Sequence, residues 1–479
     1  MHYKIKVPNA NASETVLSVT SPYDGSVIGT VETINQAGAE QALINASKLF
    51  KNKKAWLSAD ERIQILKKTA VSMQERYDDL VQIALSEGGK PLLDTRVEMN
   101  RAIDGVLNCI ELIRNESGTE IPMQRNPASA NRVAFTSKQP RGVVLAFSAF
   151  NHPINLIVHQ VAPAIATGCP VIIKPASDTA LSAFAFCELL EEAGLPKGWC
   201  QPIAVEDLKV AGKMVEDKRV DFFTFIGSGR VGWMLKAKLS AGTHCALEHG
   251  GIAPVIVAED ADVDDILPLL AKGGFYHAGQ VCVSVQRVYV HESLFDKVSQ
   301  GLVDYAKQMK SGDPADEATD IGPLIRHAET DRIESWVFEA IEEGAKLATG
   351  GKRISDAFYE PTVLINPDSK SKVSQQEIFG PVICVYSYTN MDGAIERANA
   401  VPFSFQASIF TKNIDTALAG WQDLEATAVM INDHTAFRVD WMPFGGEKES
   451  GYGIGGIPFT YRDMQMEKMA VIRSPALKY

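Results

Sequence analysis

The hydrophobic positions follow two periods along the chain, and these divide most of it into expected strands and helices. Short, mostly apolar runs, typical of strands buried on both faces, cover 143–147, 171–173, 222–226, 254–257, 285–290, 382–386, 407–411 and 428–431. Amphipathic stretches, typical of helices, cover 154–167, 179–193, 230–240, 263–277, 294–309, 328–343, 391–399 and 413–421. Because the two kinds alternate, we expect two α/β lobes, each with a mainly parallel sheet covered by helices on both faces.

The first 140 residues follow a different pattern. A β-hairpin is expected over 15–31. Ser58 and Glu61 predict a capping box, which begins one long amphipathic run that stops at Gly88. From about 120 to 140 the chain is polar and contains three prolines, so we expect an excursion from the body rather than part of the core.

The composition is that of an ordinary globular protein. With 479 residues, of which 46% are hydrophobic and 22% charged, the chain is long enough for two or three domains. No apolar run reaches the 18 residues of a membrane span, and residues 1–8 lack the apolar core of a secretory signal, so we expect a cytoplasmic protein. The net charge of −12 argues against nucleic acid or an anionic membrane as a partner.

The seven cysteines are odd in number and include no Cys-x-x-Cys pair, which argues against a disulfide framework or a bound metal ion. A free cysteine is usually a small buried hydrophobe. Cys282 has a different setting, because it ends the small polar turn Gly279-Gln280-Val281-Cys282 before an expected strand. We interpret it as a candidate nucleophile, with a buried structural thiol as the alternative.

A glycine-rich turn follows the expected strand 222–226. Its sequence, Gly227-Ser228-Gly229-Arg230-Val231-Gly232, matches the pattern that lets a backbone approach a pyrophosphate at a helix N-terminus, although the same pattern also forms ordinary tight turns. Glu248 lies where such sites place the acid that binds a ribose, about 20 residues further on. Its position before Gly250-Gly251 also suits a general base for water, or a solvated strand end.

Six motifs occur in the order and approximate spacing of the aldehyde dehydrogenase superfamily, which the sequence resembles over nearly its whole length. They are Lys174-Pro175-Ala176-Ser177, the turn at Gly227, Glu248 before Gly250-Gly251, Gly279-Gln280-Val281-Cys282, Glu377-Ile378-Phe379-Gly380-Pro381 and Pro443-Phe444-Gly445-Gly446. The segment 432–442 resembles the substrate-mouth loop of the lactaldehyde and succinate-semialdehyde dehydrogenase branch.

This resemblance implies an α/β fold of two doubly wound lobes, one a Rossmann-like cofactor lobe and one catalytic, plus a small β arm. It places the cofactor-binding domain at 1–122 and 141–250, the catalytic domain at 251–460, and an oligomerisation arm at 123–140 and 461–479. We expect a homodimer or homotetramer, because an isolated arm of two or three strands is only marginally stable.

Carried over residue by residue, the resemblance makes Cys282 the nucleophile, Glu248 the general base and Asn151 an oxyanion donor. A thiolate would add to the aldehyde carbonyl, and donors such as the Asn151 amide would stabilise the oxyanion. Hydride would pass to a nicotinamide, and Glu248 would activate water to hydrolyse the remaining thioester. Because a free thiol is mostly protonated at neutral pH, we expect an environment that lowers the pKa of Cys282.

For the cofactor, the resemblance assigns Lys174 and Glu377 to ribose hydroxyls, Phe379 to the nicotinamide ring, and Gly227 with Ser228 to the pyrophosphate. An ordinary strand-end cation is the alternative for Lys174, and a core aromatic is the alternative for Phe379.

The choice between NAD and NADP depends on Ser177. NAD-preferring relatives often carry an acid at this place, three residues after the motif lysine, where it repels a 2′-phosphate. Without that acid we expect NADP or dual use, with Arg230 or Lys174 pairing with the phosphate. A second departure is His249, which replaces the leucine that usually follows the base.

Four residues are candidates for substrate binding. Arg438 would meet an anionic aldehyde, with a surface pair between Arg438 and Asp440 as the alternative. Phe150, Phe437 and Phe444 would line the aldehyde tunnel, with core packing as the alternative. The expected reaction is the hydrolytic oxidation of a small polar or anionic aldehyde. Its rivals are acyl transfer to coenzyme A, against which the presence of Glu248 argues, and a non-catalytic cofactor-binding protein of the same fold.

Overall fold

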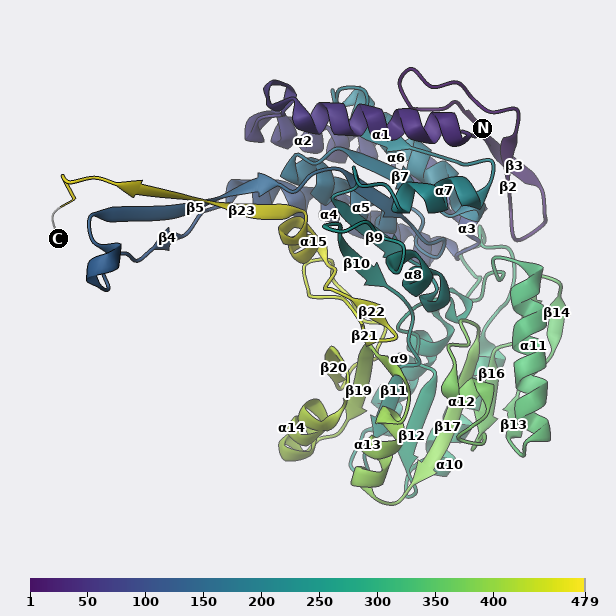
Figure 1. Cartoon of the computed structure of the whole chain (residues 1–479). Helices are drawn as coiled ribbons and strands as arrows, with labels where there is room; N and C mark the ends of the chain where they lie inside the picture. Colours follow the sequence, from purple (N-terminus) through teal and green to yellow (C-terminus); the bar gives the residue numbers. More distant parts are fainter. Residues whose placement is uncertain (478–479) are drawn as a thin grey trace.

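The computed structural model describes residues 1–477 as two α/β lobes, one above the other, and a long narrow arm that projects from them (Figure 1). Each lobe contains one large sheet flanked by helices. The two α/β lobes expected from the hydrophobic pattern are therefore confirmed.

The sheet of the first lobe has six strands, and all neighbours are parallel except β10 and β22. In spatial order they are β22 (Gly451–Tyr452), β10 (His244–Glu248), β9 (Phe222–Ile226), β6 (Val144–Phe147), β7 (Val171–Lys174) and β8 (Cys200–Pro202). The chain runs from β6 outwards to β8 and then returns to β9 on the other side of β6. In open α/β sheets, ligands bind beyond the carboxyl ends of the strands at such a reversal.

Helices cover both faces of this sheet. They are α1 (Gln36–Lys51), α2 (Ala59–Glu75), α3 (Tyr77–Gly88), α4 (Leu92–Arg114), α5 (Asn155–Thr167), α6 (Leu181–Glu192), α7 (Leu208–Val215), α8 (Gly229–Lys236) and α15 (Ile457–Asp463). Along β6, Val144 and Ala146 belong to one apolar core and Leu145 and Phe147 to the other, as the two-residue period of a strand requires.

Two details of the N-terminal region test the sequence predictions. The hairpin is confirmed as β2 (Val16–Thr20) paired with β3 (Val27–Glu32), and β1 (His2–Tyr3) runs parallel to β3. The capping box of Ser58 and Glu61 is confirmed. The single long helix is wrong, because Arg76 leaves the helical conformation, with φ −105° and ψ 27°, and separates α2 from α3.

The second lobe has a seven-stranded sheet that is parallel except where β13 meets β16. In spatial order its strands are β13 (Lys346–Thr349), β16 (Thr362–Ile365), β17 (Val382–Tyr388), β12 (Arg287–His291), β11 (Pro254–Val257), β19 (Gln406–Phe410) and β20 (Ala428–Ile431). Its helices are α9 (Val263–Phe275), α10 (Phe295–Gln308), α11 (His327–Glu342), α12 (Lys372–Gln375), α13 (Met391–Asn399) and α14 (Ile414–Asp423). The short strands β13 and β16 were not expected from the sequence.

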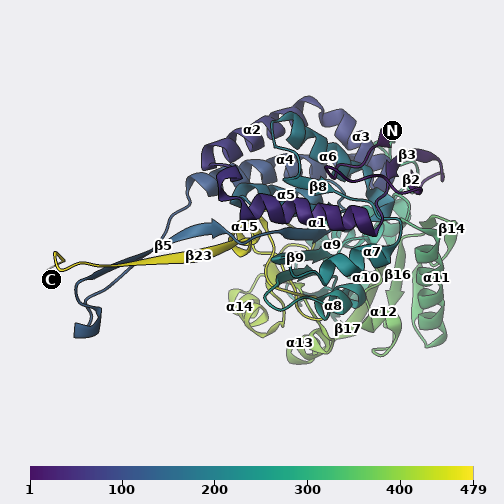
Figure 2. The ribbon, with the colours of Figure 1, turned by 45° about the horizontal axis from the view of Figure 1, so that its top comes forward.

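The arm is a narrow antiparallel sheet of β23 (Gln465–Arg473), β5 (Arg132–Pro140) and the short β4 (Glu120–Ile121). Figures 1 and 2 both show β5 and β23 extending away from the lobes. The polar segment expected over 120–140 thus contains strand β5, which pairs with the C-terminal strand β23. Its role in oligomerisation stays a prediction, as do the domain boundaries.

Neither a membrane span nor a metal cluster is found within residues 1–477. No helix in this part of the chain is long and apolar enough to cross a bilayer. No group of three or more His, Cys, Asp or Glu side chains in this part is arranged to hold a metal ion.

Candidate active site

The carboxyl ends of the first sheet bring four of the expected site residues to one edge. Lys174 ends β7 and Glu248 ends β10, while Gly227 follows β9 and Asn151 lies shortly after β6. The strand order reverses between β6 and β9, so this edge is where a ligand of an open α/β sheet binds. Only a few residues separate β10 from β11, so the amino end of the second sheet meets the same edge.

Cys282 reaches this junction from the second lobe through a tight bend. The helix expected over 263–277 ends at Phe275, because His277, Ala278 and Gly279 have φ values of 50°, 53° and 71°. A Cβ atom at Gly279 would overlap the Gly380 carbonyl oxygen, so only glycine fits there. His277 and Ala278 adopt the left-handed conformation, which costs about 1–3 kcal/mol for each residue other than glycine. Such strain persists where the surrounding structure fixes the chain.

Hydrogen bonds hold the chain on both sides of Cys282. The Gly251 N–H donates to the Cys282 carbonyl at 3.1 Å. The Gln280 amide donates to the carbonyl of Pro323 at 3.2 Å, and its Oε1 accepts from the Ile325 N–H at 3.0 Å. The thiol is thereby presented from a turn that cannot easily move.

The thiol of Cys282 donates to Glu248 Oε1 across 3.8 Å. Burial raises the pKa of Cys282 well above its usual value, the nearby Glu248 carboxylate raises it further, and the Arg438 cation opposes them. The expectation of a lowered thiol pKa is therefore wrong, because the thiol is buried beside a carboxylate. Burial also raises the pKa of Glu248, which Arg438 partly offsets. This geometry places Glu248 at the thiol.

Asn151 is tied to the nucleophile turn and to a buried ion pair. Its side-chain N–H donates to the Gln280 carbonyl at 3.0 Å. Its own carbonyl accepts from Lys90 Nζ at 3.2 Å, and Lys90 pairs with Glu98, with both side chains almost fully buried. Glu98 also accepts the Ile154 N–H at 2.9 Å, at the start of α5. Lys90 and Glu98 were not predicted from the sequence, although a lysine directly after Gly88-Gly89 was a visible signal.

A buried cluster of cations lies beside the thiol and the carboxylate. Asp440, which is 1% exposed, accepts from Arg101 Nη2 at 2.7 Å and from His159 Nε2 at 2.6 Å. The Arg438 guanidinium stacks on Phe444 at 3.4 Å, and its Nε lies 3.8 Å from Asp440 without a hydrogen-bond partner among residues 1–477. The alternative of a surface pair between Arg438 and Asp440 is wrong, because both side chains are buried.

Arg101 and His159 were not found from the sequence. They lie on α4 and α5, more than 270 residues from Asp440 along the chain. No local pattern links such distant residues, and only the packing of α4 and α5 against the loop after β20 brings them together.

Two partly buried ionisable groups in the site have bonding capacity left for a ligand. Burial lowers the pKa of Lys174 to about 8, and its Nζ donates only to the Pro175 carbonyl, at 3.1 Å, among residues 1–477. Burial raises the pKa of Glu377 to about 8, and its Oε1 is buried without a hydrogen-bond partner in that part of the chain. A free amine and a free carboxyl oxygen fit the hydroxyl groups of a dinucleotide.

The glycine turn fits a pyrophosphate for two reasons. Gly227 has φ 155°, and a Cβ atom there would lie 2.9 Å from the Phe225 ring, so only glycine is accommodated. Ser228 precedes α8 and makes no side-chain cap, which leaves amides at the helix N-terminus for an anion. These residues therefore fit NAD or NADP.

The aromatic candidates differ in their surroundings. Phe379 has a left-handed φ of 48°, and its ring lies edge-on to Phe150 with centroids 5.8 Å apart. Phe444 is buried against Phe405, at 4.7 Å, and under Arg438. Phe437 is 43% exposed.

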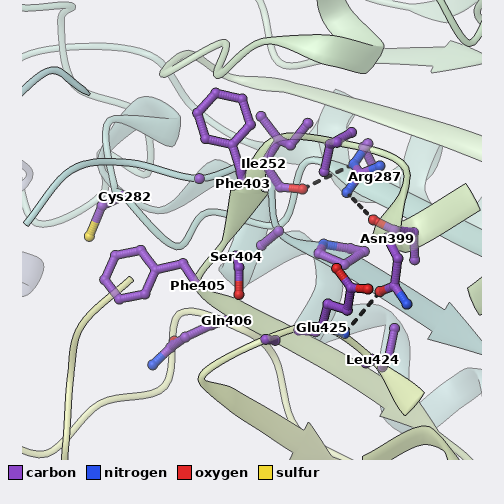
Figure 3. Close-up of a pocket in the computed structure, with 17 residues that line it drawn as sticks. Ile252, Cys282, Arg287, Asn399, Phe403, Ser404, Phe405, Gln406, Leu424 and Glu425 are labelled. Carbon is purple, nitrogen blue, oxygen red and sulfur yellow. Dashed lines mark hydrogen bonds between the residues drawn. The ribbon is translucent and has the colours of Figure 1, made fainter. Parts of the chain in front are cut away.

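A pocket behind the thiol is shown in Figure 3, with Cys282 on one side and Phe405 next to it. On the opposite side Arg287 donates to the carbonyls of Ile252, at 3.0 Å, and Ala398, at 2.9 Å. This guanidinium is held mainly by backbone carbonyls and therefore supports the fold around the thiol.

The chain resembles known proteins over almost its whole length. The model of the aldehyde dehydrogenase family matches residues 9–469. A 3-sulfolactaldehyde dehydrogenase from Priestia aryabhattai is 37% identical over 95% of this chain and 94% of its own. The crystal structure of aldehyde dehydrogenase 21 from Physcomitrella patens, in complex with the reaction product succinate, has a TM-score of 0.94, 36% identity and 98% coverage of both chains. A glyceraldehyde-3-phosphate dehydrogenase from Methanocaldococcus jannaschii, complexed with NADP, has a TM-score of 0.91 and 34% identity, covering 97% of this chain and 100% of its own. The chain belongs to the aldehyde dehydrogenase family.

Proposed function

We propose that this enzyme oxidises a small anionic aldehyde to the carboxylic acid, with Cys282 as nucleophile, Glu248 as base and Asn151 as oxyanion donor. Its cofactor is NAD or NADP. The observation that carries the proposal is the 3.8 Å contact between the Cys282 thiol and Glu248 Oε1 in a buried site. A thiol acts as a nucleophile only after it loses its proton, and Glu248 is the acceptor within reach.

The first step is proton transfer from the thiol to Glu248 as Cys282 sulfur forms a bond to the aldehyde carbon. The Asn151 amide, held at the turn by Gln280, then turns its N–H towards the developing oxyanion. Losing such a donor typically costs about 2.7–4 kcal/mol in transition-state stabilisation.

When bound, the nicotinamide cofactor supplies the hydride acceptor that converts the adduct to a thioester. Glu248, once it has released its proton to solvent, accepts a proton from a water molecule that attacks the thioester carbon. The carbon–sulfur bond then breaks, Glu248 returns its proton to the departing thiolate, and the acid leaves. Burial favours this role, because a carboxylate with a raised pKa is a stronger base than an exposed one.

For the cofactor we assign Lys174 and Glu377 to ribose hydroxyls, Gly227 and Ser228 to the pyrophosphate, and Phe379 to the nicotinamide ring. The unpaired Glu377 Oε1 supports this assignment most directly. Ser177 is exposed, and the neighbouring Asp178 is engaged by Arg326 Nε at 3.0 Å, so that acid is already neutralised. We therefore keep the preference for NADP or dual use, with Arg230 or Lys174 near the 2′-phosphate.

The substrate assignment rests on the cation cluster. Arg101 and Arg438 outnumber Asp440 in this cluster, since burial keeps the pKa of His159 below its usual value, and the nearby Glu248 offsets part of their charge. Arg438 Nε is buried with no partner among residues 1–477, so an anionic group on the substrate would satisfy it. Phe150, Phe437 and Phe444 would border the same path. The related enzymes named for sulfolactaldehyde, or bound to succinate, support a carboxylated or sulfonated aldehyde.

The domain boundaries that we propose separate cofactor binding, catalysis and oligomerisation. The cofactor-binding domain would comprise 1–122 and 141–250, the catalytic domain 251–460, and the oligomerisation arm 123–140 and 461–479. The exposed apolar side chains of β5 and β23 support a homodimer or homotetramer in which the arm is covered by another copy.

A steady-state screen tests the proposal. Carboxylated, sulfonated, phosphorylated and uncharged aldehydes of equal chain length are compared with NAD and with NADP, with and without coenzyme A. We expect reduced cofactor and free acid from the anionic aldehydes without coenzyme A. Formation of an acyl-coenzyme A product would favour the acylating reaction, and no cofactor reduction with any aldehyde would favour a non-catalytic protein.

A further inference from the structure

His249 follows the proposed base directly and fills the space beneath the glycine turn. Its side chain is 2% exposed and packs between Phe225 and Trp233, with each ring centroid 5.7 Å away. A Cβ atom at Gly232 would overlap the imidazole ring. The ring and the glycine are therefore complementary in shape, and the imidazole touches the turn from inside the protein.

One hydrogen bond of this ring defines its tautomer. Nδ1 lies 2.9 Å from the Gly227 carbonyl oxygen. Because a carbonyl can only accept, Nδ1 carries the hydrogen and donates it. Nε2 is buried and has no hydrogen-bond partner among residues 1–477, and burial lowers the pKa of His249. The ring is therefore neutral, with its hydrogen on Nδ1.

The same glycine is bound a second time by the neighbouring residue. The Gly227 N–H donates to the Glu248 carbonyl at 3.0 Å. Both polar backbone groups of Gly227 are thus fixed by two consecutive residues at the end of β10, one of which is the proposed base. A leucine at position 249 would leave the Gly227 carbonyl without its buried donor.

We infer that His249 is a positioning residue that fixes the Gly227 peptide groups in the orientation that the dinucleotide pyrophosphate requires. The inference rests on the proposed function of the turn. The residue acts through Gly227 and touches neither substrate nor thiol, so its effect falls on cofactor affinity. The Michaelis constant for the aldehyde is expected to stay within about twofold, because that side of the site is unchanged.

Two substitutions separate the hydrogen bond from packing. His249→Leu keeps an apolar side chain of similar reach but removes the donor, whereas His249→Asn keeps an N–H group close to the position of Nδ1 but fills less space. We expect His249→Leu to raise the dissociation constants of NAD and NADP about 3- to 10-fold in titration calorimetry, as for one lost hydrogen bond. His249→Asn should bind more tightly than His249→Leu. The opposite order would show that the ring only fills space and would overturn the inference.

A second measurement needs no activity. In protein labelled with ¹⁵N-histidine, nuclear magnetic resonance should detect at neutral pH at least one neutral imidazole with its hydrogen on Nδ1, and His249→Leu should remove one such signal. His244→Leu, at the exposed amino end of the same strand, is the matched control and should leave both the signal and cofactor affinity unchanged. Absence of this tautomer in the unmodified enzyme would overturn the inference.

The two proposals fail in different ways. If the unmodified enzyme binds neither NAD nor NADP, the function proposed for the turn is wrong. If it binds the cofactor and His249→Leu binds equally well, only the role of His249 is wrong.

Discussion

The sulfur of Cys282 lies 3.8 Å from Oε1 of Glu248, and the charge of the carboxylate raises the pKa of the thiol. Burial raises the pKa of both the thiol and the carboxyl group. The pair therefore holds its proton tightly. The Arg438 cation lowers the pKa of both groups and so offsets part of the effect of burial.

Replacement of the nucleophile should abolish oxidation. We expect Cys282→Ala to show no measurable aldehyde oxidation, because no other group can form the thioester, while its affinity for NAD and NADP stays within about twofold. Reduced cofactor is followed by absorbance and binding by titration calorimetry. Cys245→Ala, which removes a half-buried thiol on β10, is the control and should retain activity. Substantial turnover by Cys282→Ala would exclude Cys282 as the nucleophile.

Replacement of the base should trap the thioester. Glu248→Gln keeps the shape of the side chain but cannot accept a proton, so thioester formation should slow because the thiol must lose its proton to water, and deacylation should slow by about 10²- to 10⁴-fold. A single turnover should release up to one equivalent of reduced cofactor per site, and mass spectrometry should then find an acyl adduct on Cys282. An unchanged steady-state rate without any adduct would assign the base elsewhere.

The pH dependence follows from the direction of the Glu248 shift. The carboxylate must be ionised to accept a proton, and burial raises its pKa above the usual value of about 4.3. Deacylation should therefore decline on the acidic side as the pH falls through this raised pKa, at a higher pH than for an exposed glutamate. This decline is measured as the rate at which a preformed acyl enzyme releases the carboxylic acid at different pH values. If the acidic decline persists unchanged in Glu248→Gln, another group causes it.

Arg438 should determine the preference for charged substrates. Arg438→Met removes the cation but keeps a long side chain over Phe444. We expect kcat/KM for an anionic aldehyde to fall about 10- to 100-fold, as for a lost charged hydrogen bond. The fall for an uncharged aldehyde of equal length should be much smaller. Arg219→Met, which breaks a surface pair with Glu40, is the matched control. Equal losses for both aldehydes would mean that Arg438 acts only on the thiol and the base.

Ser177 should control discrimination against the 2′-phosphate. Ser177→Glu introduces a carboxylate, and repulsion of about 1 kcal/mol in a solvated site would weaken NADP about fivefold while NAD is unaffected. Ser177→Gln has the same size without the charge and should preserve the ratio of the two affinities. Calorimetry with both cofactors measures that ratio. An unchanged ratio in Ser177→Glu would place the adenosine ribose away from residue 177.

The regular elements were predictable because each obeys a local rule. Strands β9, β11 and β20 and helix α13 agree with their expected limits, since apolar runs and periodic stretches are local properties of the sequence. The break at Arg76 was not visible, because the apolar period continues from α2 into α3. The left-handed residues His277 and Ala278 were also hidden, since tertiary packing imposes their conformation.

The site was only partly predictable. The motif residues were found through the family resemblance, and the sheet edge then explains why they meet. The direction of the Cys282 pKa shift was wrong, because burial and the distance to Glu248 are properties of the folded chain. The links from Arg101 and His159 to Asp440 depend on contacts between distant segments, which a single sequence does not reveal.

The arm leaves a strand edge and several apolar side chains exposed on a single chain. Among residues 1–477, no other strand pairs with the outer edge of β23, and exposed apolar side chains, Phe135, Met469, Val471 and Ile472, lie on it and on β5. An edge of this kind is a template for pairing with any extended chain. A chain whose two lobes have already folded is therefore still vulnerable to aggregation through the arm.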